Sequence, residues 1–340
     1  MHDGEAARVS RVTMGKVGKS ILVALGLIIL ASVTLAGFGI YKYGPKLGIW
    51  FPSPSPERYG NELLSWMESG VYADGPKWAE AKRAAAKGIK DAKSLQETET
   101  VINKALKVAG GKHSFILTKD MQKKSENSYA APTVKVEGKI ATATLPETMG
   151  TPEQATDYTK KLATGLASAQ NICGAVVDLR NNFGGTMYPM ISGVSALLPE
   201  GKLSSFTGAA TMDLYLVDGN IHLGAKDGNS PTNFKIPTRK LKVPVAILTD
   251  GHTASSAEQT LIAFKGLDYT RTFGEPTAGY ASVNSSYKLP TGSLMQLTNG
   301  FTKDRTGNLY KEQPIKADVP TTAEQAPKAA TEWLAKMGCR

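Results

Sequence analysis

The sequence is poor in the residues on which metal sites and disulfide scaffolds depend. It holds only two cysteines, Cys173 and Cys339, among 340 residues. That number excludes a framework of several disulfides and every cysteine-rich zinc module. No cluster of metal ligands, phosphate-binding loop or nucleotide fingerprint occurs in the sequence either. We therefore expect neither a metal nor another cofactor.

Histidine is equally scarce. The chain has four, His2, His113, His222 and His252, so a mechanism that needs histidine as a proton acceptor has few candidates. The rest of the composition, 41% hydrophobic and 21% charged residues, is that of an ordinary globular protein. The length allows one large domain or two modest ones.

One long run without any charge is present, between residues 20 and 41 (SILVALGLIILASVTLAGFGIY). As a helix that rises 1.5 Å per residue it would be about 33 Å long, enough to cross a bilayer core of roughly 30 Å. The run is longer than the apolar region of a signal peptide, and neither an A-x-A cleavage site nor a lipid-accepting cysteine follows it. It predicts an uncleaved transmembrane anchor over residues 20–41.

The charges beside this run indicate its orientation. Residues 1–19 hold four basic and two acidic residues. Because positively charged flanks stay in the cytoplasm, we expect residues 1–19 to be a cytoplasmic tail and the rest to lie outside a Gram-positive-like cell. The outer part then carries +8 of the net charge of +10. This favours anionic membrane and wall polymers as neighbours, although a solvated surface explains it equally well. Five lysines between 77 and 93 fit a solvated helix face better than a nucleic-acid surface, because they lie outside the cell.

Beyond the anchor, turn formers and hydrophobic spacing divide the chain. Residues 42–60 are rich in proline and glycine and predict a short stalk. Residues 61–111 have helical spacing, with a capping box that begins at Ser94. From residue 112 onward, segments with strand character alternate with segments of helical character, which indicates a second structural region over residues 112–340.

Two segments of this region, 172–179 and 243–250, have the continuous hydrophobicity of buried strands, and 284–313 shows the turn signals of hairpins. The alternation predicts an α/β (α+β) core with a partly parallel sheet and β-hairpins. In such sheets ligands bind outside the carboxyl ends of the strands. The segments that follow the two buried strands are therefore the candidate site.

The segment after the second strand, Thr253-Ala-Ser-Ser-Ala-Glu258, places two serines where a helix begins. The positive end of the helix dipole and the free N–H groups there can stabilise an oxyanion, which suits a nucleophile for acyl transfer. Serine and threonine are also common helix caps, so capping alone is the alternative explanation.

The segment after the first strand is Asp178-Leu-Arg-Asn-Asn-Phe-Gly-Gly185. Its paired glycines, Gly184 and Gly185, allow the backbone to approach a substrate closely and to aim an N–H group at a developing negative charge. The alternative is a tight turn without a catalytic role, locked by an ion pair between Asp178 and Arg180.

A serine nucleophile needs a base. Lys265 would lie about 15 Å from Ser255 along the same predicted helix. His252 stands at the strand end, where facing the Ser255 hydroxyl is awkward, and His222 belongs to an alternating, strand-like segment. His113, which follows a glycine break and opens a strand, is the best remaining candidate.

Together, these motifs resemble those of the C-terminal processing (tail-specific) peptidases and their tricorn-type relatives, over roughly residues 95–320. The motifs are Lys-His113-Ser-Phe, Asp178-Leu-Arg-Asn-Asn-Phe-Gly-Gly, Thr-Ala-Ser255-Ser-Ala-Glu258, Gly274-Glu-Pro-Thr-Ala-Gly279 and Ala317-Asp318-Val319. Several separated motifs in the same order are much harder to obtain by chance than one. The resemblance implies a serine peptidase core over residues 112–340.

One position departs from the family pattern. Members with a Ser–Lys dyad carry a lysine after the Gly-Glu-Pro-Thr-x-Gly run, and here this place is Tyr280. Tricorn-type members use a histidine from the earlier motif, and the resemblance to them implies His113 as the base. No spare stretch is long enough for the PDZ domain that many processing peptidases carry.

Within the family, the anchor, the chain length, the missing lysine and the Thr-Ala-Ser-Ser-Ala-Glu motif resemble the nisin resistance proteins. This resemblance implies an extracellular, membrane-anchored peptidase that removes the C-terminal tail of a lantibiotic such as nisin. A charge of +8 outside the cell does not favour a cationic peptide of this kind. General processing of surface-protein tails and sequestration of a peptide without cleavage are the alternatives.

The family glutamate sets the register of the serines. Matching it to Glu258 makes Ser255, rather than Ser256, the implied nucleophile. The oxyanion would then be bound by the N–H group of Ser256 and by that of Gly184 or Gly185.

The remaining candidates are less specific. Glu258 either orients His113 or merely favours the helix dipole, and the sequence does not separate the two roles. Three polar residues of the same segments are candidates for substrate binding: Asn181, Asn182 and Thr253.

Overall fold

The computed structural model describes residues 16–232, 234 and 239–340, with the backbone alone for residues 16–24 and 26. The chain forms two compact units, Met1–Pro54 and Ser55–Arg340. Most of the tail expected over residues 1–19, including His2, lies outside the described residues.

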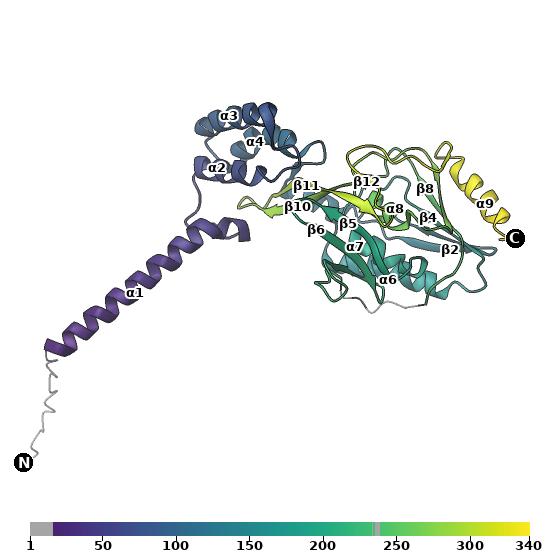
Figure 1. The fold of residues 1–340 in the computed structure, drawn as a ribbon, viewed down its shortest axis with the longest axis horizontal. Coiled ribbons are helices and arrows are strands. Elements are labelled where there is room, and N and C mark those ends of the chain that lie inside the picture. The colour runs from purple at the N-terminus through teal and green to yellow at the C-terminus, as the bar shows by residue number, and fades with distance from the viewer. Residues whose placement is uncertain (1–15, 233, 235–238) are drawn as a thin grey trace, which may run out of the picture. The chain divides into compact units, whose positions relative to one another are not determined.

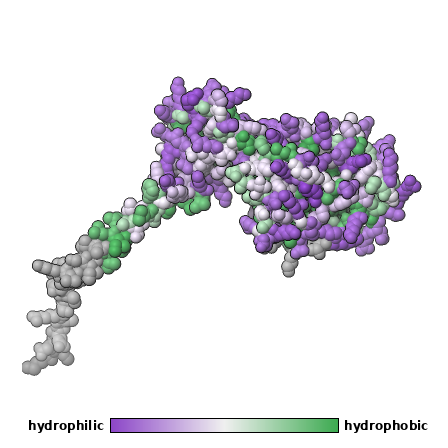
Figure 2. Space-filling view, in the orientation of Figure 1, coloured by the Kyte–Doolittle hydropathy of each residue, from purple (hydrophilic) through white to green (hydrophobic). Residues whose placement is uncertain are grey.

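The first unit contains one long helix, α1 (Lys16–Tyr43), followed by a short 3-10 turn at Gly44–Leu47. Its leucines are exposed to an unusual degree, 62% for Leu27 and 72% for Leu35, and Figure 2 shows apolar residues along the helix. The window Leu27–Leu47 has the length and hydropathy of a membrane span. It overlaps the predicted anchor, and a helix that exposes apolar residues all round is typical of such a span.

The second unit begins with three packed helices, which confirm the helical spacing of this region. Their buried contacts come from residues three and four positions apart, as an amphipathic helix requires. The Ser94 hydroxyl accepts the N–H of Glu97, and the Glu97 carboxylate accepts the N–H of Lys93. The first helix starts inside the segment that we expected to be a stalk. The helices are α2 (Pro56–Met67), α3 (Gly75–Asp91) and α4 (Leu95–Gly110).

The second unit also contains an antiparallel sheet of seven strands, in which β11 pairs with the largest number of neighbours. The long β11 pairs with β1, β5, β10 and β12, and the meander β5–β6–β7 extends the sheet on one side. The strands are β1 (Phe115–Leu117), β5 (Gly201–Thr207), β6 (Thr211–Val217), β7 (Asn220–Leu223), β10 (Ser282–Lys288), β11 (Leu294–Asp304) and β12 (Leu309–Tyr310).

A second sheet of six strands has the order β13-β9-β8-β4-β3-β2 and is parallel except for the hairpin β2–β3. Its central strands β4 and β8 are buried along their whole length, as their continuous hydrophobicity predicted. The strands are β2 (Thr133–Glu137), β3 (Ile140–Thr144), β4 (Gly174–Asp178), β8 (Val245–Thr249), β9 (Thr270–Gly274) and β13 (Val319–Pro320).

Helices cover both faces of the parallel sheet (Figure 1). Alternate residues of β4 and β8 explain this: Val177 and Ile247 face one core, while Val176 and Leu248 face another. The first core is shared with α6 (Pro152–Ser168), α7 (Met187–Gly193) and α8 (Ser256–Phe264). The second core is shared with α9 (Ala326–Lys336). The remaining helix is the short, exposed α5 (Lys119–Asn127). The predicted α/β class with a partly parallel sheet is confirmed.

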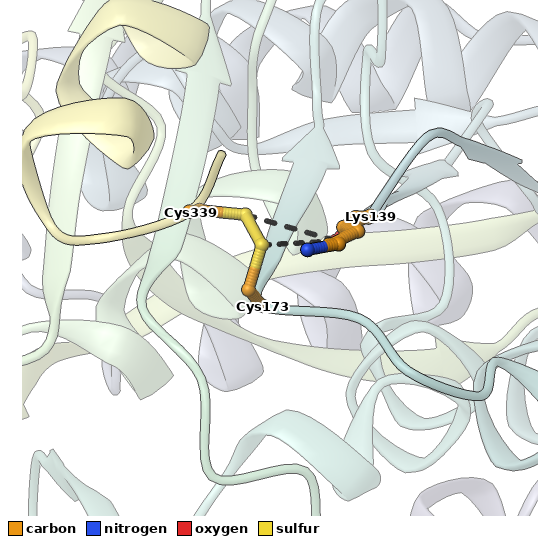
Figure 3. The surroundings of a disulfide bond; sticks show 3 residues. All are labelled: Lys139, Cys173 and Cys339. Atoms are coloured by element: carbon orange, nitrogen blue, oxygen red, sulfur yellow. Dashed lines mark hydrogen bonds between the residues drawn. A yellow bond between two sulfur atoms is a disulfide. The ribbon is translucent and has the colours of Figure 1, made fainter.

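The two cysteines form a disulfide, which the sequence analysis did not foresee. Cys339 follows α9 and Cys173 precedes β4, 166 positions earlier (Figure 3). Such a spacing says nothing about proximity, because the fold of the intervening chain decides it. In the chain-entropy description, a bridge across so long a loop destabilises the unfolded chain by roughly 5 kcal/mol.

The parallel pairing of β4 with β8 decides where the candidate segments lie. Because Asp178 lies opposite Leu248, the two strands end at the same edge of the sheet. The loops that follow them touch, through a hydrogen bond from the Ala254 N–H to the Asn182 carbonyl (2.9 Å). Both predicted segments therefore belong to one site.

Candidate active site

The turn between β8 and α8 holds Ser255 in an unusual conformation. Its φ is +51°, in a region that costs an L-residue about 1–3 kcal/mol. The surrounding chain supports this conformation: the Glu258 carboxylate accepts the Ser255 N–H, and the Gln259 N–H donates to the Ser255 carbonyl, both at 2.9 Å. A strained serine in a sharp strand-to-helix turn is the geometry of a nucleophile elbow.

His113 lies directly against this serine. Its Nε2 is 3.0 Å from Ser255 Oγ, although 142 positions separate the two residues. The fold brings them together because α4 ends at Gly110 and β1 begins at Phe115, beside the hairpin β10–β11. The structure thus joins the serine and the histidine that the sequence analysis selected from different regions.

The surroundings of His113 keep its ring uncharged. Burial and the neighbouring positive charge of Lys112 lower the pKa of His113 to about 4. At neutral pH the ring therefore has a free lone pair. With that lone pair on Nε2, it can accept the Ser255 hydroxyl proton.

Three residues from distant segments fix the position of His113. Ser282 Oγ lies 2.9 Å from Nδ1 of the ring. The His113 N–H donates to the Glu312 carboxylate at 3.1 Å, and the His113 carbonyl accepts the Asn284 side-chain amide at 3.0 Å. The imidazole is thus held through its ring and through both of its backbone polar groups.

Glu258 is buried against the backbone and does not bond to His113. Besides the Ser255 N–H, its carboxylate accepts the N–H groups of Gly279 (2.9 Å) and Tyr280 (2.6 Å) and the Thr277 hydroxyl. Burial raises its pKa, while these donors act in the opposite direction. Glu258 therefore joins the serine turn to residues 277–280, a role that neither of the two expectations included.

Two backbone N–H groups are candidates for binding an oxyanion. In the described part of the chain, no acceptor receives the N–H of Ser256 or of Gly185. Ser256 is the first residue of α8, where N–H groups lack helical partners. The N–H of Gly184 is engaged, since it donates to Asn182 Oδ1 at 2.8 Å. Of the two expected glycines, Gly185 has the available donor.

Both glycines are required by close packing as well as by their positive φ. A Cβ on Gly184 would lie 2.8 Å from the Ser255 Cβ, and one on Gly185 would lie 1.9 Å from the Thr148 carbonyl oxygen. Their φ values are +112° and +110°. The glycine pair thus allows this loop to pack closely against Ser255.

The residues expected to bind substrate differ in accessibility. Asn182 and Thr253 are fully buried: Asn182 donates to the carbonyls of Leu145 and Pro146, and Thr253 donates to that of Leu179. Burial leaves neither side chain a surface that a substrate could touch. The third expected residue, Asn181, is exposed.

The ion pair between Asp178 and Arg180 is structural. It is bidentate, with donor–acceptor distances of 2.9 and 2.7 Å, and the Arg180 guanidinium also donates to the Ala323 carbonyl. The pair thus braces the glycine loop against the chain near α9 and leaves the chemistry to other residues.

The other basic candidates contact groups other than Ser255. His222 bonds to the Gly228 carbonyl, and Lys265 pairs with Asp318 at 3.3 Å. His252 is exposed and packs on Phe183. Within the described residues, no group of three or more His, Cys, Asp or Glu side chains could hold a metal ion.

Tyr280 occupies the place of the missing lysine. Its ring meets that of His113 edge-on, with 5.3 Å between the centroids, and the Lys112 ammonium lies 4.2 Å from the Tyr280 centroid. An aromatic side chain thus fills the place of the dyad lysine and packs beside the histidine.

The sequence analysis missed several residues of the site: Ser282, Asn284, Glu312 and the amide of Gln259. No local motif marks Ser282, the first residue of an ordinary strand, or Glu312, which lies in an irregular segment. Gln259 directly follows the glutamate of the serine motif, and its Nε2 donates to the Ala281 carbonyl at 3.0 Å. These contacts are formed between segments that are distant in sequence and are brought together by the fold.

Comparison with known proteins shows what this chain is similar to. The sequence model of peptidase family S41 matches residues 139–321, which include Ser255 but not His113. The nisin-resistance protein of Lactococcus lactis subsp. lactis is 38% identical over 323 residues, which cover 94% of this chain and 98% of that protein.

Solved structures show the same fold. A lipoprotein from Streptococcus agalactiae superposes with a TM-score of 0.75 at 31% identity, over 85% of this chain and 99% of that one. The photosystem II D1 C-terminal processing protease superposes with a TM-score of 0.52 at 14% identity, over 80% and 94% of the two chains. The second likeness concerns the fold alone.

Proposed function

Since this chain belongs to peptidase family S41, a family of serine peptidases, we propose that it hydrolyses peptide bonds with Ser255 as the nucleophile and His113 as the base. The observation that carries the proposal is the 3.0 Å contact between Ser255 Oγ and His113 Nε2. It is made at a strained turn, beside two N–H groups that have no acceptor among the described residues.

The first step is the attack of Ser255 Oγ on the substrate carbonyl while His113 Nε2 takes the hydroxyl proton. The negative charge that develops on the carbonyl oxygen is stabilised by the N–H groups of Ser256 and Gly185. His113 then gives its proton to the leaving amine, and the C-terminal fragment departs.

The second step regenerates the serine. His113 removes a proton from a water molecule, which attacks the acyl-serine ester. The ester bond to Ser255 Oγ then breaks, His113 returns the proton to that oxygen, and the N-terminal fragment leaves as a carboxylic acid. Glu258 acts by holding the backbone of Ser255 and of residues 279–280, since its carboxylate is fully occupied by those donors. No step needs a metal or another cofactor.

For the substrate, we propose the C-terminal tail of a lantibiotic such as nisin. Support comes from the nisin-resistance protein, to which this chain is similar along nearly the whole length of both. The basic surface of the outer part remains unfavourable for a cationic peptide. The Glu312 carboxylate beside His113 places a negative charge at the site itself, which offsets part of that repulsion.

For the location, we propose a single membrane span near the N-terminus, with the peptidase outside the cell and the tail of residues 1–19 inside. The exposed apolar helix α1 and the surplus of basic residues before it support this orientation. The disulfide is a second, independent argument, because disulfides persist in oxidising surroundings and are rare in the cytosol. Protease added to intact cells should degrade the chain beyond residue 43 and spare the tail.

One experiment separates this proposal from its alternatives. The full chain, reconstituted in lipid vesicles, is incubated with nisin and with a linear peptide of the same residue order without thioether rings, and the products are weighed by mass spectrometry. A C-terminal fragment from nisin alone supports the lantibiotic substrate. Fragments from both peptides indicate a general tail peptidase, and nisin bound without any fragment indicates sequestration.

The controls are two serine variants. Ser255→Ala should yield no fragment. Ser286→Ala removes an exposed hydroxyl that donates to the Gln296 side chain and should cleave like the unchanged chain. Cleavage by Ser255→Ala at the original rate would overturn the proposed mechanism.

A further inference from the structure

Ser282, the first residue of β10, is buried and contacts the ring of the histidine on the side away from Ser255. We propose that Ser282 is the positioning residue of His113: it accepts the Nδ1–H and thereby directs the Nε2 lone pair at the nucleophile. This inference rests on the proposed function and adds a third member to the pair of Ser255 and His113. The arrangement is a relay of serine, histidine and serine, without a carboxylate on the ring.

The tautomer of His113 is the reason that the chemistry needs such a partner. A neutral imidazole carries one proton, and only the form with hydrogen on Nδ1 leaves Nε2 free to accept the Ser255 proton. The Ser282 hydroxyl oxygen at 2.9 Å is the side-chain acceptor for that hydrogen, and the backbone of Ser282 also hydrogen-bonds the ring. Without an acceptor there, the unproductive tautomer, with hydrogen on Nε2, would compete.

The helix that carries the nucleophile also holds the segment that ends in Ser282. The Glu258 carboxylate binds the N–H groups of Gly279 and Tyr280, and Gln259 Nε2 binds the Ala281 carbonyl. Ser282 itself then pairs with Phe301 of β11. Consecutive residues from 279 to 282 are thus fixed by α8, by the sheet and by the histidine.

Glu258 and Gln259 have a common structural role, because both hold the segment that leads to Ser282. Ser255 and Ser282 are separated by 27 positions of chain, and two adjacent side chains of α8 set the distance between them. The histidine ring fits between the two serines, at 3.0 Å from one and 2.9 Å from the other. The side chains of α8 therefore set the spacing of the two serines that contact His113.

The charges that face His113 are few. Lys112 is its neighbour in sequence, the Glu312 carboxylate binds its backbone N–H, and Glu258 lies beyond Ser255. Tyr280 contributes an aromatic edge. Neither the Glu312 carboxylate nor the Glu258 carboxylate bonds to the ring. A carboxylate introduced at position 282 would bond to it and should therefore favour the protonated imidazole strongly.

The test compares Ser282→Ala and Ser282→Asp in the full chain, with Ser286→Ala on the same strand as the matched control. We expect Ser282→Ala to lower kcat about 10-fold or more and to leave KM unchanged, because the buried hydroxyl does not touch substrate. We expect Ser282→Asp to move the acid limb of the kcat/KM profile upward by about one pH unit or more. Rates are referred to the number of active sites titrated with a serine-directed fluorophosphonate.

A measurement on the unchanged chain covers the case in which a variant does not fold. Nitrogen-15 NMR of histidine-labelled chain reports which ring nitrogen carries the proton, and His113→Gln identifies the signal of His113. We expect the proton on Nδ1 at neutral pH. A proton on Nε2, an unchanged kcat in Ser282→Ala, or an unmoved acid limb in Ser282→Asp would each overturn the inference.

The proposed function is judged separately. If Ser255→Ala is inactive while Ser282→Ala retains full kcat, only the role of Ser282 is refuted. If Ser255→Ala remains active, the proposed function itself fails.

Discussion

The two halves of the site are held in different ways. The elbow, defined as residues 250–259, is fixed mainly by its own members, since Glu258 and Gln259 bond to Ser255 from the next turn of chain. The cradle, defined as His113 with Ser282, Asn284 and Glu312, is fixed by residues 169 to 199 positions from the histidine.

This difference teaches where each catalytic property originates. The elbow is a local structure, in which a strand end, a strained turn and a helix start occur within ten residues. The cradle exists only when the helices α2–α4, the hairpin β10–β11 and the segment after β12 have all assembled. A general loosening of the fold should therefore displace the base before it displaces the nucleophile.

The most severe way to probe the comparison is to remove one catalytic side chain from each half. We expect Ser255→Ala and His113→Ala each to lower kcat by about 10⁴-fold or more, and the double variant to be no slower, because the two act as one unit. Initial rates of peptide cleavage by equal amounts of folded protein measure this.

The matched controls for these two variants are Ser286→Ala and His222→Ala. Both residues are polar, lie outside the elbow and the cradle and should leave kcat unchanged. If the double variant were slower by the product of the two single effects, elbow and cradle would work independently and the comparison would be wrong.

A smaller effect is expected from a change in the loop that supports the elbow. In Gly185→Ala, the new Cβ meets the Thr148 carbonyl at 1.9 Å, so the loop must shift and its N–H group leaves the oxyanion site. We expect kcat to fall about 10²- to 10³-fold, measured with the same peptide.

Gly224→Ala is the control for this substitution. Gly224 also has a positive φ, +83°, and no atom of the described residues lies within 4 Å of the position of a Cβ. This variant should lose about 1 kcal/mol of unfolding free energy in a denaturant titration and keep its kcat. Equal losses of kcat in both variants would mean that backbone strain, and not the oxyanion site, is responsible.

The smallest effect concerns the electrostatics of the cradle. Because activity needs neutral His113, whose pKa is lowered to about 4, the acid limb of kcat/KM should lie near pH 4, below the usual value for histidine. Lys112→Gln removes a positive charge that lowers this pKa, so the limb should move upward by a fraction of a pH unit.

Lys104→Gln makes the same change of charge on the exposed face of α4 and should leave the acid limb in place.

The lowered pKa of His113 also predicts how the stability of the fold depends on pH. A lowered pKa in the folded state means that the unfolded chain binds the proton more readily. The contribution of His113 to the unfolding free energy should therefore fall as the pH drops from about 6.5 toward 4, and rising stability over that interval would contradict the assignment.

The sequence predicted the elbow well because its signals are local. A continuous hydrophobic strand, a pair of serines and the beginning of a helix all lie within fifteen residues. The alternation of elements predicted a partly parallel sheet, and the structure adds that β4 and β8 are neighbours in it. His113 was reached by elimination among four histidines and by resemblance to a family. The contact with Ser255 is a property of the fold.

The cradle could not be predicted in the same way. Ser282 and Glu312 approach His113 because β11 pairs with β1, β10 and β12, and no short-range pattern encodes that arrangement. Asn182 and Thr253 were expected at the substrate surface because they are polar residues beside the motifs. They are buried because the loops that carry them need internal donors to close against each other.

The disulfide between Cys173 and Cys339 makes residues 173–339 one covalent ring. Ser255, the glycine loop, Ser282 and Glu312 all lie inside that ring, whereas His113 lies on the arm outside it. A single cut in the ring by a neighbouring protease leaves both pieces joined. A single cut between residues 113 and 173 separates the base from the nucleophile's ring, whereas a cut between residues 43 and 113 leaves the two on one piece. The part of the chain most exposed to inactivation by one nick is thus the stretch between His113 and Cys173.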